Sequence, residues 1–114
     1  MSATNFYLDK GFTPSNRITL INGLDTIAVW TPTTSTRVVL TEMSLSANYG
    51  GTIAFYFGNL AGTRFAEFLV GASSTITPAI GAVESTMYDR VIFAKVGTSG
   101  TDGWRVNLTG FELQ

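Results

Sequence analysis

Apolar and polar residues alternate with a period of two along most of this chain, and no segment shows the 3.6-residue period of an amphipathic helix. The clearest alternation spans residues 37–46, gives way to turn residues over 48–51, and resumes over 52–57. This pattern predicts a strand, a turn and a second strand. The fold class expected from it is all-β.

The same alternation predicts eight strands in the whole chain. They cover residues 17–21, 26–30, 36–47, 52–57, 64–70, 75–79, 90–96 and 103–113. Asn22 and Gly23, which separate the first two strands, form a dipeptide that is typical of a two-residue hairpin turn. Strands of this number and spacing predict a single antiparallel β-sandwich of the jelly-roll type.

Length and local composition divide the chain into two parts. Because 114 residues leave room for one hydrophobic core, a single globular domain is expected. Residues 17–114 carry the strand pattern, whereas residues 1–16 combine turn-forming residues with a few large apolar side chains. We interpret residues 1–16 as a docking arm. Its apolar side chains are Phe6, Tyr7, Leu8 and Phe12.

Alternation also assigns one side of each strand to the core. The inward side chains expected are Val39, Met43, Leu45, Ile53, Phe55, Phe57, Ala66, Phe68, Val70, Ile92, Ala94, Val96, Trp104, Val106 and Leu108. In the last strand Phe111 and Leu113 are apolar one residue out of phase with this set, and Gly110 lies at the change. A phase change at a glycine predicts a β-bulge that lets both halves of the strand reach the core.

Some apolar residues remain on the sides of strands that this assignment gives to solvent. They are Val38, Leu40, Tyr56, Val91 and Phe93. If these side chains adjoin, they form an oligomer interface, because large exposed apolar patches mark contacts. Two alternatives stay open. One strand could be assigned one residue out of register, or residues 1–16 could cover this face.

Composition favours binding or assembly over catalysis. The chain has no histidine and no cysteine, the side chains that perform most acid–base, nucleophilic and transition-metal chemistry near neutral pH. The spacing of its carboxylates pairs no two of them across a substrate. We therefore predict that the protein is not an enzyme and uses no metal and no cofactor.

Charge and hydropathy exclude two classes of partner. The net charge is −1 and the basic residues are scattered without a run, whereas a nucleic-acid surface needs clustered positive charge. No stretch of about 18 apolar residues and no signal-peptide pattern is found, so neither a membrane span nor secretion is expected. The protein is expected to be made in a cytoplasm and to bind neither nucleic acid nor membrane.

Two tyrosines next to predicted loops offer an alternative, ligand-binding function. Tyr49 lies at the turn over residues 48–51, and Tyr88 lies at the end of the long irregular stretch over residues 71–89. An exposed aromatic ring provides an apolar platform on which a sugar ring can stack. The same side chains equally suit packing or an interface, and the pattern does not decide between these roles.

Three stretches of the chain resemble small jelly-roll proteins encoded among the virion genes of tailed bacteriophages. They read TRVVLT at 36–41, GTIAFYFG at 51–58 and GWRVNLTGFE at 103–112, so the likeness extends over about residues 36–113. The resemblance implies an auxiliary capsid decoration (cement) protein of the virion, bound to the major capsid protein as a homotrimer. It alternatively implies a trimeric fibre or spike tip that binds a receptor or a host surface glycan.

Overall fold

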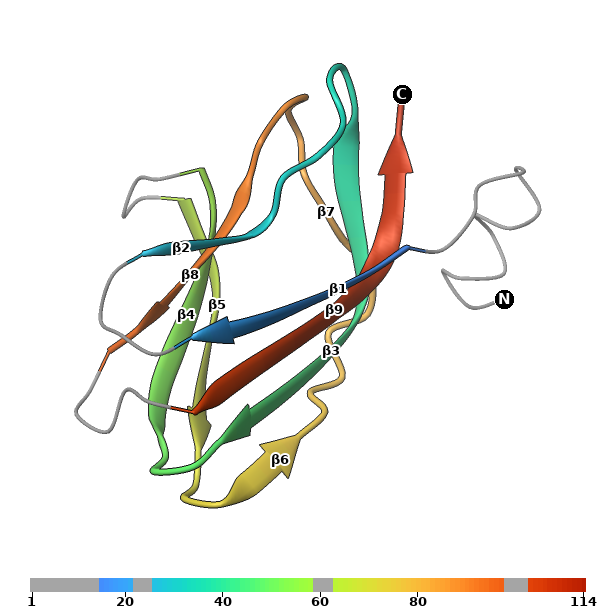
Figure 1. The fold of residues 1–114 in the computed structure, drawn as a ribbon. Coiled ribbons are helices and arrows are strands. Elements are labelled where there is room, and N and C mark those ends of the chain that lie inside the picture. Colours follow the sequence, from blue (N-terminus) through green and yellow to red (C-terminus); the bar gives the residue numbers. More distant parts are fainter. Residues whose placement is uncertain (1–14, 22–25, 59–62, 98–102) are drawn as a thin grey trace.

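The computed structural model describes residues 15–21, 26–58, 63–97 and 103–114, which form nine strands in two antiparallel sheets (Figure 1). The strands are β1 (Ser15–Ile21), β2 (Ile27–Trp30), β3 (Arg37–Ala47), β4 (Gly51–Phe57), β5 (Arg64–Val70), β6 (Ser74–Ile76), β7 (Val83–Glu84), β8 (Ile92–Val96) and β9 (Trp104–Leu113). Sheet A has the order β1-β9-β3-β6, with β7 also paired to β3, and sheet B has the order β2-β8-β4-β5. The predicted all-β sandwich is confirmed.

The strand order is that of a jelly roll. Strand β4 pairs with β5, β3 with β6, β2 with β8 and β1 with β9, so the chain forms one long antiparallel ribbon. Successive pairs of this ribbon belong alternately to sheet B and sheet A. The ribbon therefore winds around the core in the manner of two Greek keys.

The hairpin predicted at Asn22 and Gly23 is wrong. Strands β1 and β2, which flank these residues, belong to different sheets and pair with β9 and β8 instead of with each other. An Asn-Gly dipeptide favours a tight turn locally, but the pairing of the flanking strands depends on which face each strand buries. In this fold the chain crosses from one sheet to the other between them.

The core fills the space between the two sheets. Its largest fully buried side chains include Trp30, Trp104 and Phe55, and full burial of such a side chain contributes about 1.5–3 kcal/mol. The alternation correctly predicted the inward residues of β4, β8 and the first part of β9. Those that belong to the buried core cluster are Ile53, Phe55, Ile92, Ala94, Val96, Trp104, Val106 and Leu108.

The predicted β-bulge exists, but it lies in the partner strand. Leu40 pairs with Gly110 and Glu42 pairs with Thr109, so Thr41 of β3 is the extra residue. Strand β9 stays in phase through Gly110. A Cβ atom at Gly110 would lie 2.0 Å from the carbonyl oxygen of Val39, so the glycine lets the two backbones approach closely.

This bulge reverses the predicted sides of several residues. Val38 and Leu40 are 0% exposed and belong to the core between the sheets, so their assignment to an exposed oligomer interface is wrong. Val39, Phe111 and Leu113 alternate with inward residues in their strands and therefore point to the outer side of sheet A, away from sheet B. The physical reason is that the apolar run at 38–40 is buried on both sides of the strand.

The long stretch over residues 71–89 is partly ordered by pairing to β3. It holds β6, which is shorter than the strand predicted at 75–79, and β7, which the alternation did not predict. Ile80 and Val83 of this stretch pack against the core. Within the described segments, no helix has the length and apolar character needed to cross a membrane.

Candidate functional site

The outer side of sheet B carries an apolar cluster, which we call the sheet B patch and define as Tyr56, Val91 and Phe93. Tyr56 of β4 and Phe93 of β8 are direct cross-strand partners, and Val91 accepts a backbone hydrogen bond of 2.8 Å from Gly58. All three side chains are half-buried, and Ala28 of β2 extends the same row opposite Phe93. The structure therefore brings together three of the five residues predicted as an interface.

Charged side chains border this patch on the same outer side. Arg64 pairs in register with Tyr56, and the next row contains Glu67 and Lys95, both opposite Ala54. Arg64 and Glu67 form an ion pair of 3.4 Å in which both side chains are about half exposed, so the pair contributes little to stability. An apolar centre with a polar border is the usual arrangement of a protein interface.

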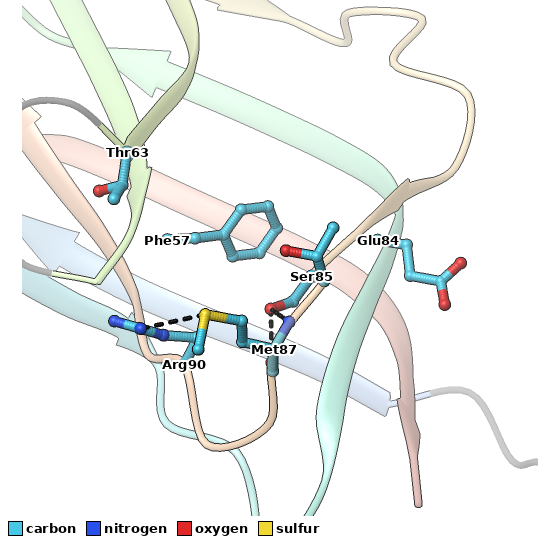
Figure 2. A pocket seen from close by; sticks show the side chains of 7 residues that line it. Phe57, Thr63, Glu84, Ser85, Met87 and Arg90 are labelled. Atoms are coloured by element: carbon cyan, nitrogen blue, oxygen red, sulfur yellow. Dashed lines mark hydrogen bonds between the residues drawn. The ribbon is translucent and has the colours of Figure 1, made fainter.

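A second candidate site is a pocket at one end of the sandwich, which we call the end pocket (Figure 2). It has a volume of about 320 Å³, within the range of small-molecule sites. It lies between the end of β4, the start of β5 and the segment that joins β7 to β8. The lining residues are Phe57, Thr63, Glu84, Ser85, Thr86, Met87 and Arg90.

The positive charge of this pocket comes from Arg90. Its Nη2 donates to the sulfur of Met87 at 3.1 Å, and its Nη1 lies near the open face of Gly58. The carboxylate of Glu84 is directed away from Arg90 in Figure 2 and is bound by Arg37. Among the described residues, no carboxylate forms an ion pair with Arg90. The guanidinium therefore keeps donors that an anionic group can use.

The wall of the end pocket is fixed by hydrogen bonds within its own loop and by others to the turn before β3. The hydroxyl of buried Ser85 donates to the carbonyl of Met87 at 2.7 Å and accepts from the Met87 N–H at 3.3 Å. Asp89 adopts a positive φ of 59°, donates its N–H to Thr36, and accepts from the Ser35 N–H at 2.6 Å. Asp tolerates this backbone conformation better than most residues. The loop is therefore tied to the turn before β3.

Phe57 forms the apolar side of the pocket. Its ring stacks on Phe65 with the centroids 4.3 Å apart, and Figure 2 shows the ring between Thr63 and Ser85. Stacking of this kind holds a ring in one orientation. The pocket thus combines a fixed aromatic ring, hydroxyl groups and one guanidinium.

The two tyrosines predicted as a ligand platform lie at opposite ends of β3. Tyr49 is the second residue after the end of β3 and is 66% exposed. Tyr88 is 52% exposed, and its ring lies 6.0 Å from the guanidinium of Arg37, the first residue of β3. An eleven-residue strand is about 33 Å long. The two rings therefore do not share a site, and only Tyr88 is next to the end pocket.

A partly buried polar cluster around Glu112 links the two sheets. Its carboxylate accepts from Trp30 Nε1 at 3.1 Å and from Thr33 Oγ1 at 2.6 Å, and Arg17 lies 3.7 Å away with its guanidinium 4.8 Å from the Trp30 ring. Burial raises the pKa of the Glu112 carboxyl, but the hydrogen bonds from Thr33 and Trp30 and the charge of Arg17 outweigh it and lower the pKa overall. This carboxylate is an acceptor at neutral pH and serves a structural role.

Other carboxylates of the described segments have similar structural partners. Glu84 is bound by Arg37, Glu67 by Arg64, and Asp89 by the Ser35 N–H. In the described part of the chain, no three residues of the types His, Cys, Asp and Glu cluster as a metal site would require.

The predicted docking arm falls almost entirely outside the described residues. This applies to Phe6, Tyr7, Leu8 and Phe12. Ser15 and Asn16, assigned to the arm by the sequence, are the first two residues of β1 and pair with β9. The β-sandwich therefore begins two residues earlier than expected.

Sequence reasoning missed Arg90, Phe57 and Thr63 as one group. They come from three separate segments, and nothing in the local pattern of each one marks it as a ligand-binding residue. The cluster of Glu112, Trp30 and Arg17 was missed for the same reason. Only the order of the strands brings these side chains together.

Comparison with known proteins leaves the family and the function of this chain open. No protein-family model matches, and no curated protein matches. Similar solved structures include a Bacillus endospore appendage protein of disulfide-linked pili, with 15% identity, coverage of 90% of this chain and 91% of that chain, and a TM-score of 0.48.

Two further similar structures have other roles. A carbohydrate-binding module of Cellvibrio mixtus lichenase 5A, in complex with cellotriose, has 14% identity, coverage of 91% and 88%, and a TM-score of 0.45. The Drosophila NLP core, described with pentamer formation and histone binding, has 15% identity, coverage of 90% and 98%, and a TM-score of 0.45. None of the three is described as a phage protein. The two antiparallel sheets of this chain follow from its own strand pairing.

Proposed function

We propose that this chain is a non-enzymatic structural protein that self-associates through sheet B, and that it serves as an auxiliary capsid decoration protein of a phage virion. The observation that carries the proposal is the sheet B patch. Tyr56 and Phe93 adjoin on the outer side of a sheet, where a monomer would place polar residues. Association would remove these half-buried rings from water.

The arrangement of the patch suits a homotrimer or another closed assembly. The apolar row lies on strands β2, β4 and β8, whose pairing holds it rigidly, and Arg64, Glu67 and Lys95 supply a polar border. A stable contact buries about 1,600 Å² in total, so neighbouring parts of sheet B also have to take part. The low share of charged residues, 13%, agrees with a surface that is covered in an assembly.

The capsid partner rests on the resemblance to phage virion jelly rolls. In this proposal the assembled protein sits on the outside of the head and contacts the major capsid protein. An antibody against the chain should then detect it in purified virions of the phage that encodes it. Its absence from virions would remove the decoration role, whatever the outcome for self-association.

Self-association is tested by the native mass in size-exclusion chromatography with light scattering. The native protein should have about three times the chain mass of 12.2 kDa. Phe93→Glu should reduce the mass to that of a monomer, since a buried unpaired charge opposes association. The matched control is Ile18→Glu, which changes a 54% exposed side chain on the outer side of sheet A and should leave the trimer intact. A monomeric native protein would contradict the proposal.

A second candidate function is recognition of an acidic glycan, and the end pocket is the observation that favours it. Arg90 offers free donors to a carboxylate, Phe57 offers an apolar ring, and Thr63 lies on the opposite wall. A sugar acid presents this combination of a carboxylate, hydroxyl groups and an apolar face. In the fibre-tip alternative, this pocket with Tyr88 beside it would bind the host surface glycan.

Glycan recognition is tested by titrating the protein with glucuronic-acid oligosaccharides in a calorimeter. Arg90→Gln should weaken binding at least tenfold, because it removes the charge-assisted hydrogen bonds. Tyr49→Ala should change the affinity very little, since Tyr49 lies at the far end of β3. Lack of heat with the native protein, or equal affinities for all three proteins, would exclude this function.

A further inference from the structure

Within the described segments each sheet has two edges, and three of these four edges carry features that oppose pairing with another chain. In sheet A one edge is formed by β6 and β7, which are only three and two residues long. In sheet B both edge strands contain a bulge, because Val29 is an extra residue in β2 and Phe65 is an extra residue in β5. Short strands and bulges both interrupt the row of backbone groups that a further strand would pair with.

Strand β1 forms the fourth edge and has neither of these features. Its seven residues pair with β9 in an unbroken register, from Ser15 opposite Gly110 to Ile21 opposite Trp104. Among the described strands, β1 has a neighbour in its sheet on one side only (Figure 1). Backbone N–H and C=O groups of a strand point alternately to its two sides, so β1 presents a regular row of donors and acceptors at its outer edge.

Two exposed apolar side chains lie along this edge. Ile18 is 54% exposed and Leu20 is 69% exposed, and they pair with the polar residues Asn107 and Arg105 of β9. Both lie on the outer side of sheet A, because the residues that alternate with them pair with core residues. Natural edge strands commonly carry charged residues that prevent pairing. The edge of β1 instead combines a regular backbone with apolar side chains, which favours the addition of a strand.

We propose that β1 pairs in the antiparallel direction with β1 of a second copy, around a two-fold axis at Thr19. This register places Ile18 of each copy directly opposite Leu20 of the other copy, so the same apolar cross-strand pair forms twice. The two sheets A then join into one continuous sheet with the order β6-β3-β9-β1-β1-β9-β3-β6. A contact of this kind is self-complementary, as a two-fold interface requires.

The side chains of β1 favour this register over its neighbours. An axis at Arg17 would place two arginines directly opposite each other, and like charges in that position destabilise a sheet. An axis at Ile18 would place Leu20 opposite the polar side chain of Asn16. An axis at Thr19 places no two charged residues opposite each other and pairs both exposed apolar residues. A second copy of the chain supplies this match by symmetry, which identifies it as the occupant of the edge.

This contact goes beyond the proposed function and does not depend on it. The outer side of sheet B faces away from sheet A, so the sheet B patch stays accessible when β1 is paired. Pairing of one edge strand gives a smaller contact than the about 1,600 Å² of a typical stable interface. We therefore expect it to form at high concentration, or between molecules that are already held side by side, and to link assemblies to one another.

Cysteine cross-linking of the full-length chain tests the pairing and its register. The chain has no cysteine, so Ile18→Cys and Leu20→Cys each introduce a single thiol at an exposed position. The two variants are mixed, one of them labelled with ¹⁵N, and oxidised with copper phenanthroline. Mass spectrometry should show the mixed disulfide dimer forming about fivefold faster, or more, than dimers of identical chains. In this register identical residues are diagonal neighbours about 7–8 Å apart, which is too far for a disulfide.

Leu69→Cys is the matched control for cross-linking. Leu69 is 76% exposed and lies on β5, the edge of sheet B that contains a bulge. Its disulfide dimers should form as slowly as the identical-chain dimers of Ile18→Cys. Equal rates for the mixed dimer and for all identical-chain dimers would overturn the inference, whatever occupies the edge instead. Dimers of Ile18→Cys that form faster than the mixed dimer would exclude the axis at Thr19.

A second measurement uses the dependence of the mass on concentration. In sedimentation equilibrium, the mean mass of the native protein should at least double between about 10 μM and about 1 mM. The double variant Ile18→Lys, Leu20→Lys should show no such rise, because lysines on an edge strand oppose pairing, whereas Leu69→Lys should behave like the native protein. The same rise in the double variant, or a constant native mass, would contradict the inference. A monomer that doubles would support it and contradict only the assembly through sheet B.

Discussion

The two sheets bury their inner sides alike and treat the apolar residues of their outer sides differently. In sheet A, Val39 and Phe111 on the outer side are fully buried within the chain. In sheet B, Tyr56 and Phe93 occupy the equivalent position of a cross-strand pair but are only half-buried. An apolar residue on an outer side is therefore not by itself a sign of a partner. The extent to which the side chain is buried shows whether it is already covered within the chain or is still available to a partner.

The largest effect is expected when an aromatic ring on each outer side is truncated and the losses in the free energy of unfolding are compared. Phe111→Ala should lower the free energy of unfolding by about 3–5 kcal/mol, because it removes a fully buried ring and leaves a cavity. Phe93→Ala should lower it by about 1 kcal/mol, because the half-buried ring is already partly in water. Urea unfolding of both variants in the monomeric state measures the two values. Similar losses would mean that the two outer sides are covered to the same extent.

The next largest effect is expected where β3 and β9 approach most closely. Gly110→Ala should destabilise the protein by about 2–3 kcal/mol, since the new Cβ atom would meet the Val39 carbonyl oxygen at 2.0 Å. The two strands would have to separate at the bulge that turns Val39 and Phe111 outward. Thermal unfolding measures the loss.

Gly71→Ala is the matched control for this substitution. Its Cβ atom would meet the side-chain oxygen of Ser74 at 3.3 Å, a group that can move aside. We expect a change of at most about 0.5 kcal/mol. A comparable loss in both variants would show that the close approach at the bulge is not the cause.

The sequence was sufficient to predict the strands and most of the core. Regular alternation in β4 and β8 assigned Ile53, Phe55 and Ile92 correctly, because each of these strands has a clear apolar side. It was insufficient for β3, where Val38, Val39 and Leu40 are all apolar and all buried. A run of three buried residues has no preferred phase, so the position of the bulge depends on the pairing with β9.

The candidate sites were harder to predict than the fold. Tyr56 and Phe93 were found because both break the alternation of their strands, which is a local signal. Phe57, Thr63 and Arg90 give no such signal, because their meeting depends on how the ends of β4, β5 and β8 are arranged. The alternation also cannot show whether an outward apolar residue is covered by another part of the chain.

A smaller effect, with a dependence on pH, is expected at the polar cluster that joins the sheets. Glu112→Gln should destabilise the protein by about 1–2 kcal/mol at pH 7, since hydrogen bonds to a charged acceptor become bonds to a neutral one. Folding lowers the pKa of Glu112, so its contribution is present above the unfolded-state pKa and is lost as the pH falls through the folded-state pKa. The native protein and the variant should therefore converge in stability as the pH falls below the folded-state pKa of Glu112.

Urea unfolding at a series of pH values tests this dependence. Glu67→Gln is the control, because its ion pair with Arg64 is about half exposed and contributes little. This control should remain within about 0.5 kcal/mol of the native protein at pH 7. A constant difference between the native protein and Glu112→Gln at all pH values would show that the charge of Glu112 does not act through the cluster.

The smallest effect is expected on the edge strand of sheet A. Leu20 of β1 points to the same outer side as Phe111 but is 69% exposed, so most of its surface is in water in the folded and the unfolded chain. Leu20→Thr should therefore change the free energy of unfolding by no more than about 0.5 kcal/mol, and Thr fits a strand well. Together with Phe111→Ala, this variant locates the edge of the buried apolar area on the outer side of sheet A. A loss above about 1 kcal/mol would show that Leu20 is buried in solution, and the buried apolar area would then extend across β1.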